Sequence, residues 1–122
     1  LGFAAIENIL ILFQLGPAFL WDKTLEISIF RFLGATFLHV LTSGLVGYFV
    51  ALAVYEEQKR WRLIIAGLGI STLLHGLYNF SIMRTGGDLK ILIPVALLSL
   101  LAVFISYGFK RLKKFKSVCE IQ

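Results

Sequence analysis

Residues 27–55 decide the fold: they read ISIFRFLGATFLHVLTSGLVGYFVALAVY and carry one permanent charge, Arg31. A bilayer core about 30 Å thick is crossed by about 20 helical residues. This run is longer than that, so the helix is expected to tilt or to extend beyond the hydrocarbon. A strand is excluded because the run is too long and lacks the alternation of polar and apolar residues found in β-barrels. The stretch therefore predicts a transmembrane helix.

The rest of the chain repeats this pattern. Of its 122 residues, 58% are hydrophobic and 16% are charged, which is too apolar for an ordinary soluble domain. The charges gather in four short clusters that leave apolar runs of about 20 residues between them. We expect an all-α, polytopic membrane protein with about four transmembrane helices, at about residues 1–20, 27–55, 61–83 and 89–109. Residues 111–122 would form a basic tail.

The net charge of +5 does not indicate a nucleic-acid partner, because the basic residues follow the spans. Lys59, Arg60 and Arg62 follow the second span, and a run of five basic residues between Lys110 and Lys116 follows the fourth. The positive-inside rule then predicts that the 55–62 loop and the tail are cytoplasmic. The expected partners are the lipid bilayer, whose anionic headgroups the tail can contact, and no nucleic acid.

Apart from Arg31, which lies near the outer boundary of its span, three ionisable residues lie inside these apolar runs: Glu7, His39 and His75. Such residues are costly at membrane depth, so they normally face the bundle interior and mark a functional site. We expect them to converge. One carboxylate and two imidazoles would leave an open position on a metal ion, which suits catalytic zinc. Alternatively, Glu7 acts as a general base without metal, and His39 and Asn79 stabilise an oxyanion.

Other polar residues share faces with the two histidines. Thr42 and Ser43 follow His39 by three and four residues, and Ser71, His75 and Asn79 follow one another at steps of four. An amide one turn from a ligand histidine can orient it or donate to a developing oxyanion.

Several other residues have structural explanations. Glu56 and Glu57 lie in a short charged loop, where solvated pairs with nearby basic residues are ordinary, so we do not interpret them as a catalytic pair. Glycines in the second and third spans are expected to allow close helix contacts: Gly44, Gly47, Gly67 and Gly69. The lone Cys119 excludes an intrachain disulfide framework.

Three motifs together resemble those of PrsW-type intramembrane proteases. Residues 2–10, GFAAIENIL, resemble the GFAxxEN signature of that family. Arg31 and His39, followed by Gly47-Tyr48, resemble its second motif, and residues 74–80, LHGLYNF, resemble its HGxxN run. The order and spacing of the three agree over about residues 2–80. The family is loosely related to CAAX-type prenyl endopeptidases.

The resemblance implies a helical membrane hydrolase of the metalloprotease type in the cytoplasmic membrane of a prokaryote. Bacterial members cleave membrane-anchored anti-sigma factors at site 1. By motif match, Glu7, His39 and His75 carry over as catalytic or metal-binding residues, with zinc as the candidate metal, and Asn79 as a supporting catalytic group. The family places an EExxK-type motif before the first of these helices, and the chain begins at Leu1 without an initiator Met. We therefore expect further residues upstream.

Two other functions remain open at this point. A non-catalytic member of the same fold would bind membrane peptides as a scaffold, a hypothesis that the missing EExxK-type motif favours. A small transporter would relay protons through Glu and His, but the chain has no inverted repeat or paired broken helices. Stoichiometric metal in the purified protein would separate these alternatives.

Overall fold

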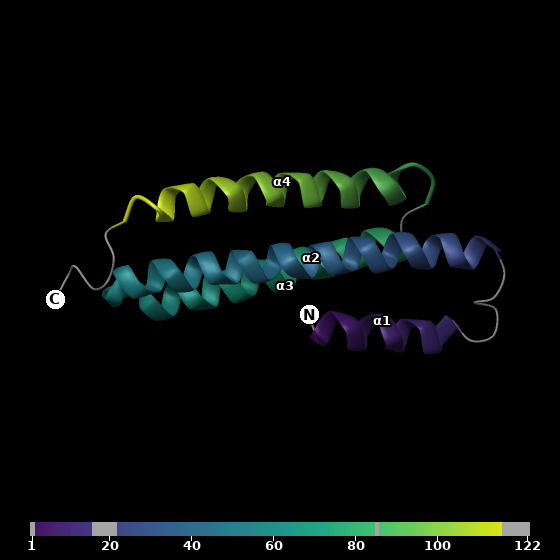
Figure 1. Ribbon diagram of the computed structural model, residues 1–122, viewed down its shortest axis with the longest axis horizontal. Helices are drawn as coiled ribbons and strands as arrows, with labels where there is room; N and C mark the ends of the chain where they lie inside the picture. The colour runs from purple at the N-terminus through teal and green to yellow at the C-terminus, as the bar shows by residue number, and fades with distance from the viewer. Residues whose placement is uncertain (1, 16–21, 85, 116–122) are drawn as a thin grey trace. The chain divides into compact units, whose positions relative to one another are not determined.

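The computed structural model describes residues 2–15, 22–84 and 86–115, with the backbone alone for residues 12, 14–15 and 22–31. Its elements are α1 (Gly2–Leu15), α2 (Asp22–Tyr55), the short 3-10 helix η2 (Glu57–Lys59), α3 (Arg60–Arg84) and α4 (Leu89–Leu112). The described residues contain no strand. The prediction of an all-α membrane protein is confirmed (Figure 1).

Three of the helices are long and apolar enough to cross a membrane: Phe32–Tyr55, Glu57–Arg84 and Leu89–Leu112. The described part of the first helix gives a shorter apolar segment, Gly2–Ile11. The first expected span continues into residues 16–20, which lie outside the described residues, as do residues 116–122 of the expected tail. In addition, α2 begins at Asp22, five residues before the apolar run that predicted it.

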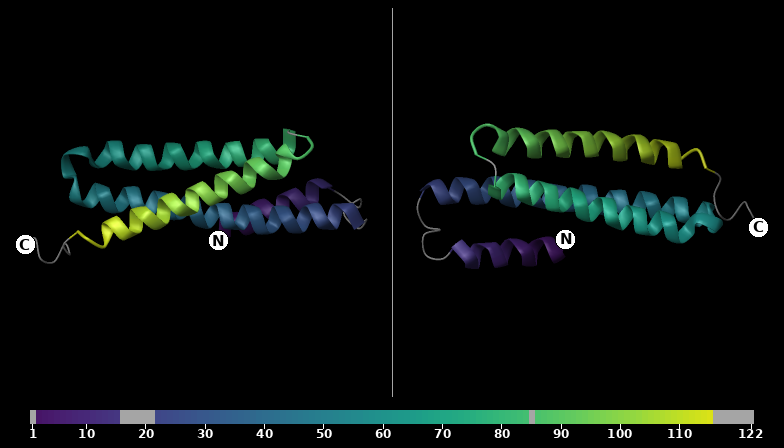
Figure 2. Two further views of the ribbon diagram at one scale, coloured as in Figure 1. Left: turned by 90° about the horizontal axis from the view of Figure 1, so that it is seen from above. Right: turned by 180° about the vertical axis from the view of Figure 1, so that it is seen from behind.

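The chain forms two compact units, residues 1–40 and 41–122, and α2 passes from one into the other. In the first unit, α1 runs antiparallel to the first part of α2 (Figure 1). In the second, α3 runs antiparallel to the rest of α2, and α4 crosses this pair obliquely (Figure 2).

The core of the second unit is a cluster of aliphatic side chains from α2 and α4. Leu41 and Leu45 of α2 pack with Leu101 and Ile105 of α4, and Leu74 of α3 lies against the cluster. Lipid tails are as apolar as leucine, so such a core is held by close packing more than by removal of apolar surface from water.

Two glycines allow helices to approach closely. A Cβ on Gly67 of α3 would lie 2.7 Å from Cβ of Phe49 on α2, and a Cβ on Gly108 of α4 would lie 3.0 Å from the Tyr48 ring. By contrast, Gly47 and Gly69 have no atom within 4 Å of such a Cβ. Of the glycines expected at helix contacts, Gly67 makes the closest one.

The outer surface of the spanning helices is apolar. Leu73 on α3 and Leu100 and Val103 on α4 are each at least 70% exposed. Such a surface is unfavourable in water and suits lipid, which agrees with the lengths of these helices.

Short polar connections join the helices of the second unit. Between α2 and α3, η2 carries Glu57 and Lys59, and Glu56 precedes it as the N-cap residue. Between α3 and α4, Gly87 has a φ of +61°, a left-handed conformation that glycine adopts without strain. The chain therefore turns at Gly87 and Asp88, and Thr85 lies outside the described residues.

Candidate functional site

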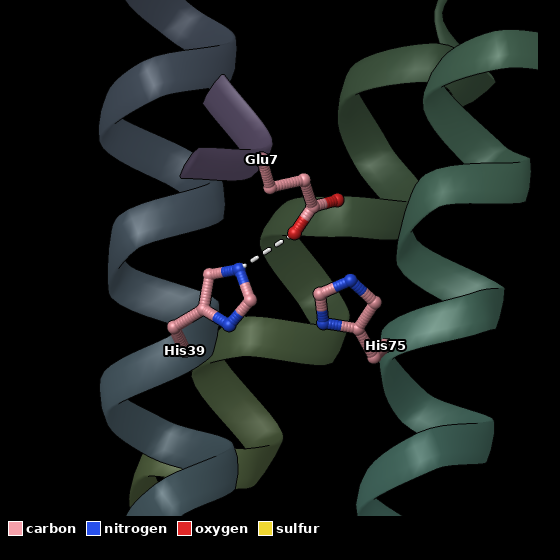
Figure 3. A group of neighbouring side chains, drawn as sticks. All are labelled: Glu7, His39 and His75. Atoms are coloured by element: carbon pink, nitrogen blue, oxygen red, sulfur yellow. Dashed lines mark hydrogen bonds and ion pairs between the residues drawn. The ribbon is translucent and has the colours of Figure 1, made fainter. Parts of the chain in front are cut away.

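A carboxyl–imidazole pair lies in the first unit. Glu7 Oε2 of α1 is 2.9 Å from His39 Nε2 of α2, and the two side chains are 20% and 13% exposed (Figure 3). The hydrogen-bonding roles depend on the histidine tautomer. The predicted convergence is thus realised for these two residues.

Two residues on one face of α1 contact His39. Phe3 precedes Glu7 by one helical turn, so both side chains lie on one face. The Phe3 ring meets His39 edge-on, with ring centroids 5.5 Å apart. An aromatic edge and a carboxylate thus both contact the same imidazole, and its position is set by two residues of α1.

His75 lies in the second unit, on α3, on the helix face that also carries Ser71 and Asn79. The three residues follow one another at steps of four, so they line one face of the helix. Ser71 is buried, and His75 and Asn79 are half-buried. Ser71 Oγ donates a hydrogen bond to the carbonyl oxygen of Thr42 on α2, at 3.2 Å. Figure 3 shows His75 as it projects from α3.

A hollow that the sequence did not reveal opens on the second unit. It has a volume of about 260 Å³ and is lined by Thr42, Ser43 and Val46 of α2 and by Ser71 of α3. The sequence placed these hydroxyl residues on the same faces as the histidines. It gave no signal that residues from two helices would line one hollow, because that depends on the pairing of α2 with α3.

Asn8 is a second feature to which the sequence assigned no role. Its side chain is 7% exposed, and its Nδ2 has no hydrogen-bond partner within the described part of the chain. A buried amide donor without a partner is rare in folded proteins, because it loses its bonds to water without replacement. The available signals were its position beside Glu7 in an apolar run and its place as the last residue of the GFAxxEN-like stretch.

The loop glutamates are solvated, as expected. Lys59 Nζ lies 3.3 Å from Glu56 Oε2, and Arg60 lies 4.0 Å from Glu57, with all four side chains at least half exposed. Pairs of this kind contribute little to stability.

Comparison with known proteins identifies the family. The model of the PrsW family intramembrane metalloproteases matches residues 1–108. The chain belongs to this family. The curated Protease PrsW of Shouchella clausii (strain KSM-K16) is 31% identical over 86 residues, which cover 70% of this chain and 36% of that protein. The chain thus spans about a third of the length of this relative. No solved structure matches the chain.

The PrsW family is described as metalloproteases, so the donor set of the chain can be tested against a metal. Two ligand atoms on one tetrahedral zinc ion, each about 2.0–2.1 Å from it, lie about 3.3 Å apart. Glu7 Oε2 and His39 Nε2 lie 2.9 Å apart, so a shift of a few tenths of an ångström would suit both for one ion. Carboxylate oxygen and imidazole nitrogen are ordinary zinc ligands. The pair therefore fits a metal.

Proposed function

We propose that the full protein is an intramembrane protease that uses water to hydrolyse a peptide bond of a membrane-anchored protein, with Glu7, His39 and His75 at the reacting centre. The 2.9 Å contact between Glu7 and His39 on apolar helices carries this proposal. Ionisable residues at membrane depth are expensive and mark functional sites. Membership of a protease family supports the reaction class.

The register of α2 against α3 supports the inclusion of His75. In the second unit, Ser71 of α3 bonds to Thr42 of α2, and the two helices run antiparallel (Figure 2). One turn forward along α3 therefore corresponds to one turn back along α2. His75 is one turn beyond Ser71 on α3, and His39 is about one turn before Thr42 on α2, so each histidine lies one turn from this hydrogen bond along its own helix.

Two mechanisms are compatible with this set of residues. In the first, Glu7, His39 and His75 would hold a zinc ion. When bound, zinc would supply Lewis acidity and lower the pKa of bound water to about 7. In the second, the Glu7 carboxylate takes a proton from the attacking water and passes it to the leaving amine nitrogen. His39 and Asn79 stabilise the oxyanion by hydrogen bonding.

The proposed substrate is a protein anchored by a single span. Such a protein can reach the site sideways through the bilayer, and the apolar outer surface of α3 and α4 is suited to that approach. By the resemblance of the motifs, we propose membrane-anchored anti-sigma factors as substrates and the cytoplasmic membrane of a prokaryote as the location.

Proteolysis of a single-span substrate by the full-length protein in proteoliposomes tests the proposal. His39→Ala and His75→Ala remove a ligand or an acid–base group, and such groups contribute about 10²- to 10⁴-fold to rate. Cleavage is expected to fall by at least about 100-fold in each. Glu57→Ala is the control, because Glu57 is solvated in the loop, and it should cleave like the parent. If the histidine variants also cleave like the parent, His39 and His75 are not part of the reacting centre and the proposal is wrong. If the parent itself does not cleave, the protein is a non-catalytic scaffold.

Metal removal separates the two mechanisms. The zinc mechanism requires stoichiometric zinc in the purified protein, loss of cleavage after chelation and recovery when zinc is restored. If cleavage survives thorough chelation and is lost in Glu7→Ala, the carboxylate acts as the base without metal.

A further inference from the structure

We infer that the hollow lined by Thr42, Ser43, Val46 and Ser71 receives the unwound main chain of the substrate beside the bond to be cleaved. This inference rests on the proposed function. It assigns a binding role to residues outside the Glu7, His39 and His75 set. The hollow lies entirely within the second unit, between α2 and α3.

The hollow lies near the middle of the apolar runs that predict two of the membrane spans. Ser43 is two residues from the centre of the run 27–55, and Ser71 is one residue from the centre of the run 61–83. At this depth lipid offers no hydrogen bonds, so a polar group there is stabilised only by protein, water or a ligand. Ser43 is nevertheless exposed. Its position indicates that the hollow accommodates a polar ligand from the bilayer.

The lining matches the chemistry of an opened main chain. A transmembrane helix satisfies its own N–H and C=O groups, and opening it near the cleaved bond leaves those groups without partners in lipid. The Ser43 hydroxyl can donate and accept a hydrogen bond. Ser71 gives its proton to the Thr42 carbonyl, so its oxygen remains available as an acceptor for an N–H group. The hollow can therefore accept main-chain groups of both kinds.

The position and volume of the hollow fit a short peptide segment. Ser71 is one turn from His75 on α3, and Ser43 is one turn from His39 on α2, which corresponds to about 5.4 Å along each helix. An extended chain rises about 3.3 Å per residue, so the hollow would hold residues within about two of the cleaved bond. Its volume of about 260 Å³ is below the roughly 300–1,000 Å³ of pockets for drug-sized ligands. The hollow therefore suits a short segment of main chain better than a larger ligand.

Photo-crosslinking in proteoliposomes tests the inference. A benzophenone amino acid replaces Ser43 in the full-length protein, which also carries His75→Ala so that bound peptide stays intact. The matched control has the same group at Val50, an exposed residue about two turns farther along the same face of α2. One probe is a single-span peptide of Leu and Ala interrupted by Asn-Gly, and the other is the same span without the interruption.

We expect the interrupted peptide to form an adduct at position 43. Its yield should be at least about tenfold higher than the yield with the uninterrupted peptide and than the yield at position 50. Equal adducts at both positions, equal adducts with both peptides, no adduct, or an adduct between two copies of the chain would each overturn the inference. Cleavage of the interrupted peptide by the parent protein is measured in parallel. Cleavage without an adduct at 43 rejects the hollow alone, and an adduct without cleavage rejects the proposed function alone.

Kinetics of cleavage provide an independent measurement. Ser43→Leu fills the hollow with an apolar side chain at a lipid-exposed position, so it should raise KM by about tenfold with kcat little changed. Ser43→Thr keeps the hydroxyl and should behave like the parent, and Val50→Leu controls for added bulk on the same face. An unchanged KM in Ser43→Leu contradicts the inference.

Discussion

At the scale of single residues, Glu7 and His39 stabilise each other in a place where either alone is costly. Removing one partner deprives the other, largely buried polar group of this hydrogen bond. A double-mutant cycle with Glu7→Ala and His39→Ala should therefore give a coupling free energy of about 1.5–3 kcal/mol, as for hydrogen bonds to charged groups. Denaturation of the purified protein in detergent measures it. The exposed pair Glu56 and Lys59 is the control, and its coupling free energy is expected to be at or below about 0.5 kcal/mol. Equal coupling free energies for the two pairs would contradict the prediction.

Replacement of Asn8, unlike replacement of Glu7 or His39, is not expected to destabilise the protein. Its Nδ2 is buried without a partner among the described residues, so replacement by the similarly sized, apolar Leu removes a desolvation cost of about 1–3 kcal/mol. Asn8→Leu should leave the thermal midpoint unchanged or raise it. Ser71→Ala is the comparison, because Ser71 bonds to the Thr42 carbonyl, and it should lower the midpoint. A clear fall in Asn8→Leu would show that Asn8 has a structural partner.

At the scale of the elements, α2 and α3 depend on one close contact at Gly67. An added methyl there would meet Cβ of Phe49, which is fixed to the α2 backbone and cannot swing away. Gly67→Ala should therefore destabilise the protein by about 1–3 kcal/mol, as overpacking does. Gly69→Ala is the matched control on the same helix, since nothing lies within 4 Å of its added methyl. The prediction is tested by measuring the unfolding midpoints of both variants in detergent. Equal midpoints would disprove the close contact at Gly67.

The sequence predicted the helices because their signal is local. Residues 27–55 alone contain enough apolar length to cross a bilayer, and the charge clusters mark the connections. The pairing of Glu7 with His39 was also predictable, since burial cost alone requires such groups to find partners. The sequence could not distinguish Gly67 from Gly69, or show that Thr42 and Ser71 line one hollow. Those facts depend on the register of α2 against α3, which no local pattern specifies.

At the scale of the whole molecule, the distribution of basic residues predicts how the helices are oriented across the membrane. The chain covers 36% of the length of the Shouchella clausii protease. The helices of the second unit nevertheless define a polarity of their own. Lys59, Arg60 and Arg62 lie at one end of α3, and the opposite end carries Arg84 and the Gly86–Asp88 turn. This asymmetry predicts which side of the membrane each connection faces.

We expect the Gly86–Asp88 turn to lie outside the cytoplasm and η2 to lie within it, because Lys and Arg are retained on the cytoplasmic side in short loops. Both are exposed, so thiol labelling can report on them. Cys119, the only cysteine, is replaced by Ser, and single cysteines are introduced at Gly86 or Glu57. A membrane-impermeant maleimide added to intact cells should label Gly86→Cys and should reach Glu57→Cys only after permeabilisation. The reverse pattern would invert the topology. The hollow would keep its depth in either case, because Ser43 and Ser71 lie near the middle of the apolar runs 27–55 and 61–83.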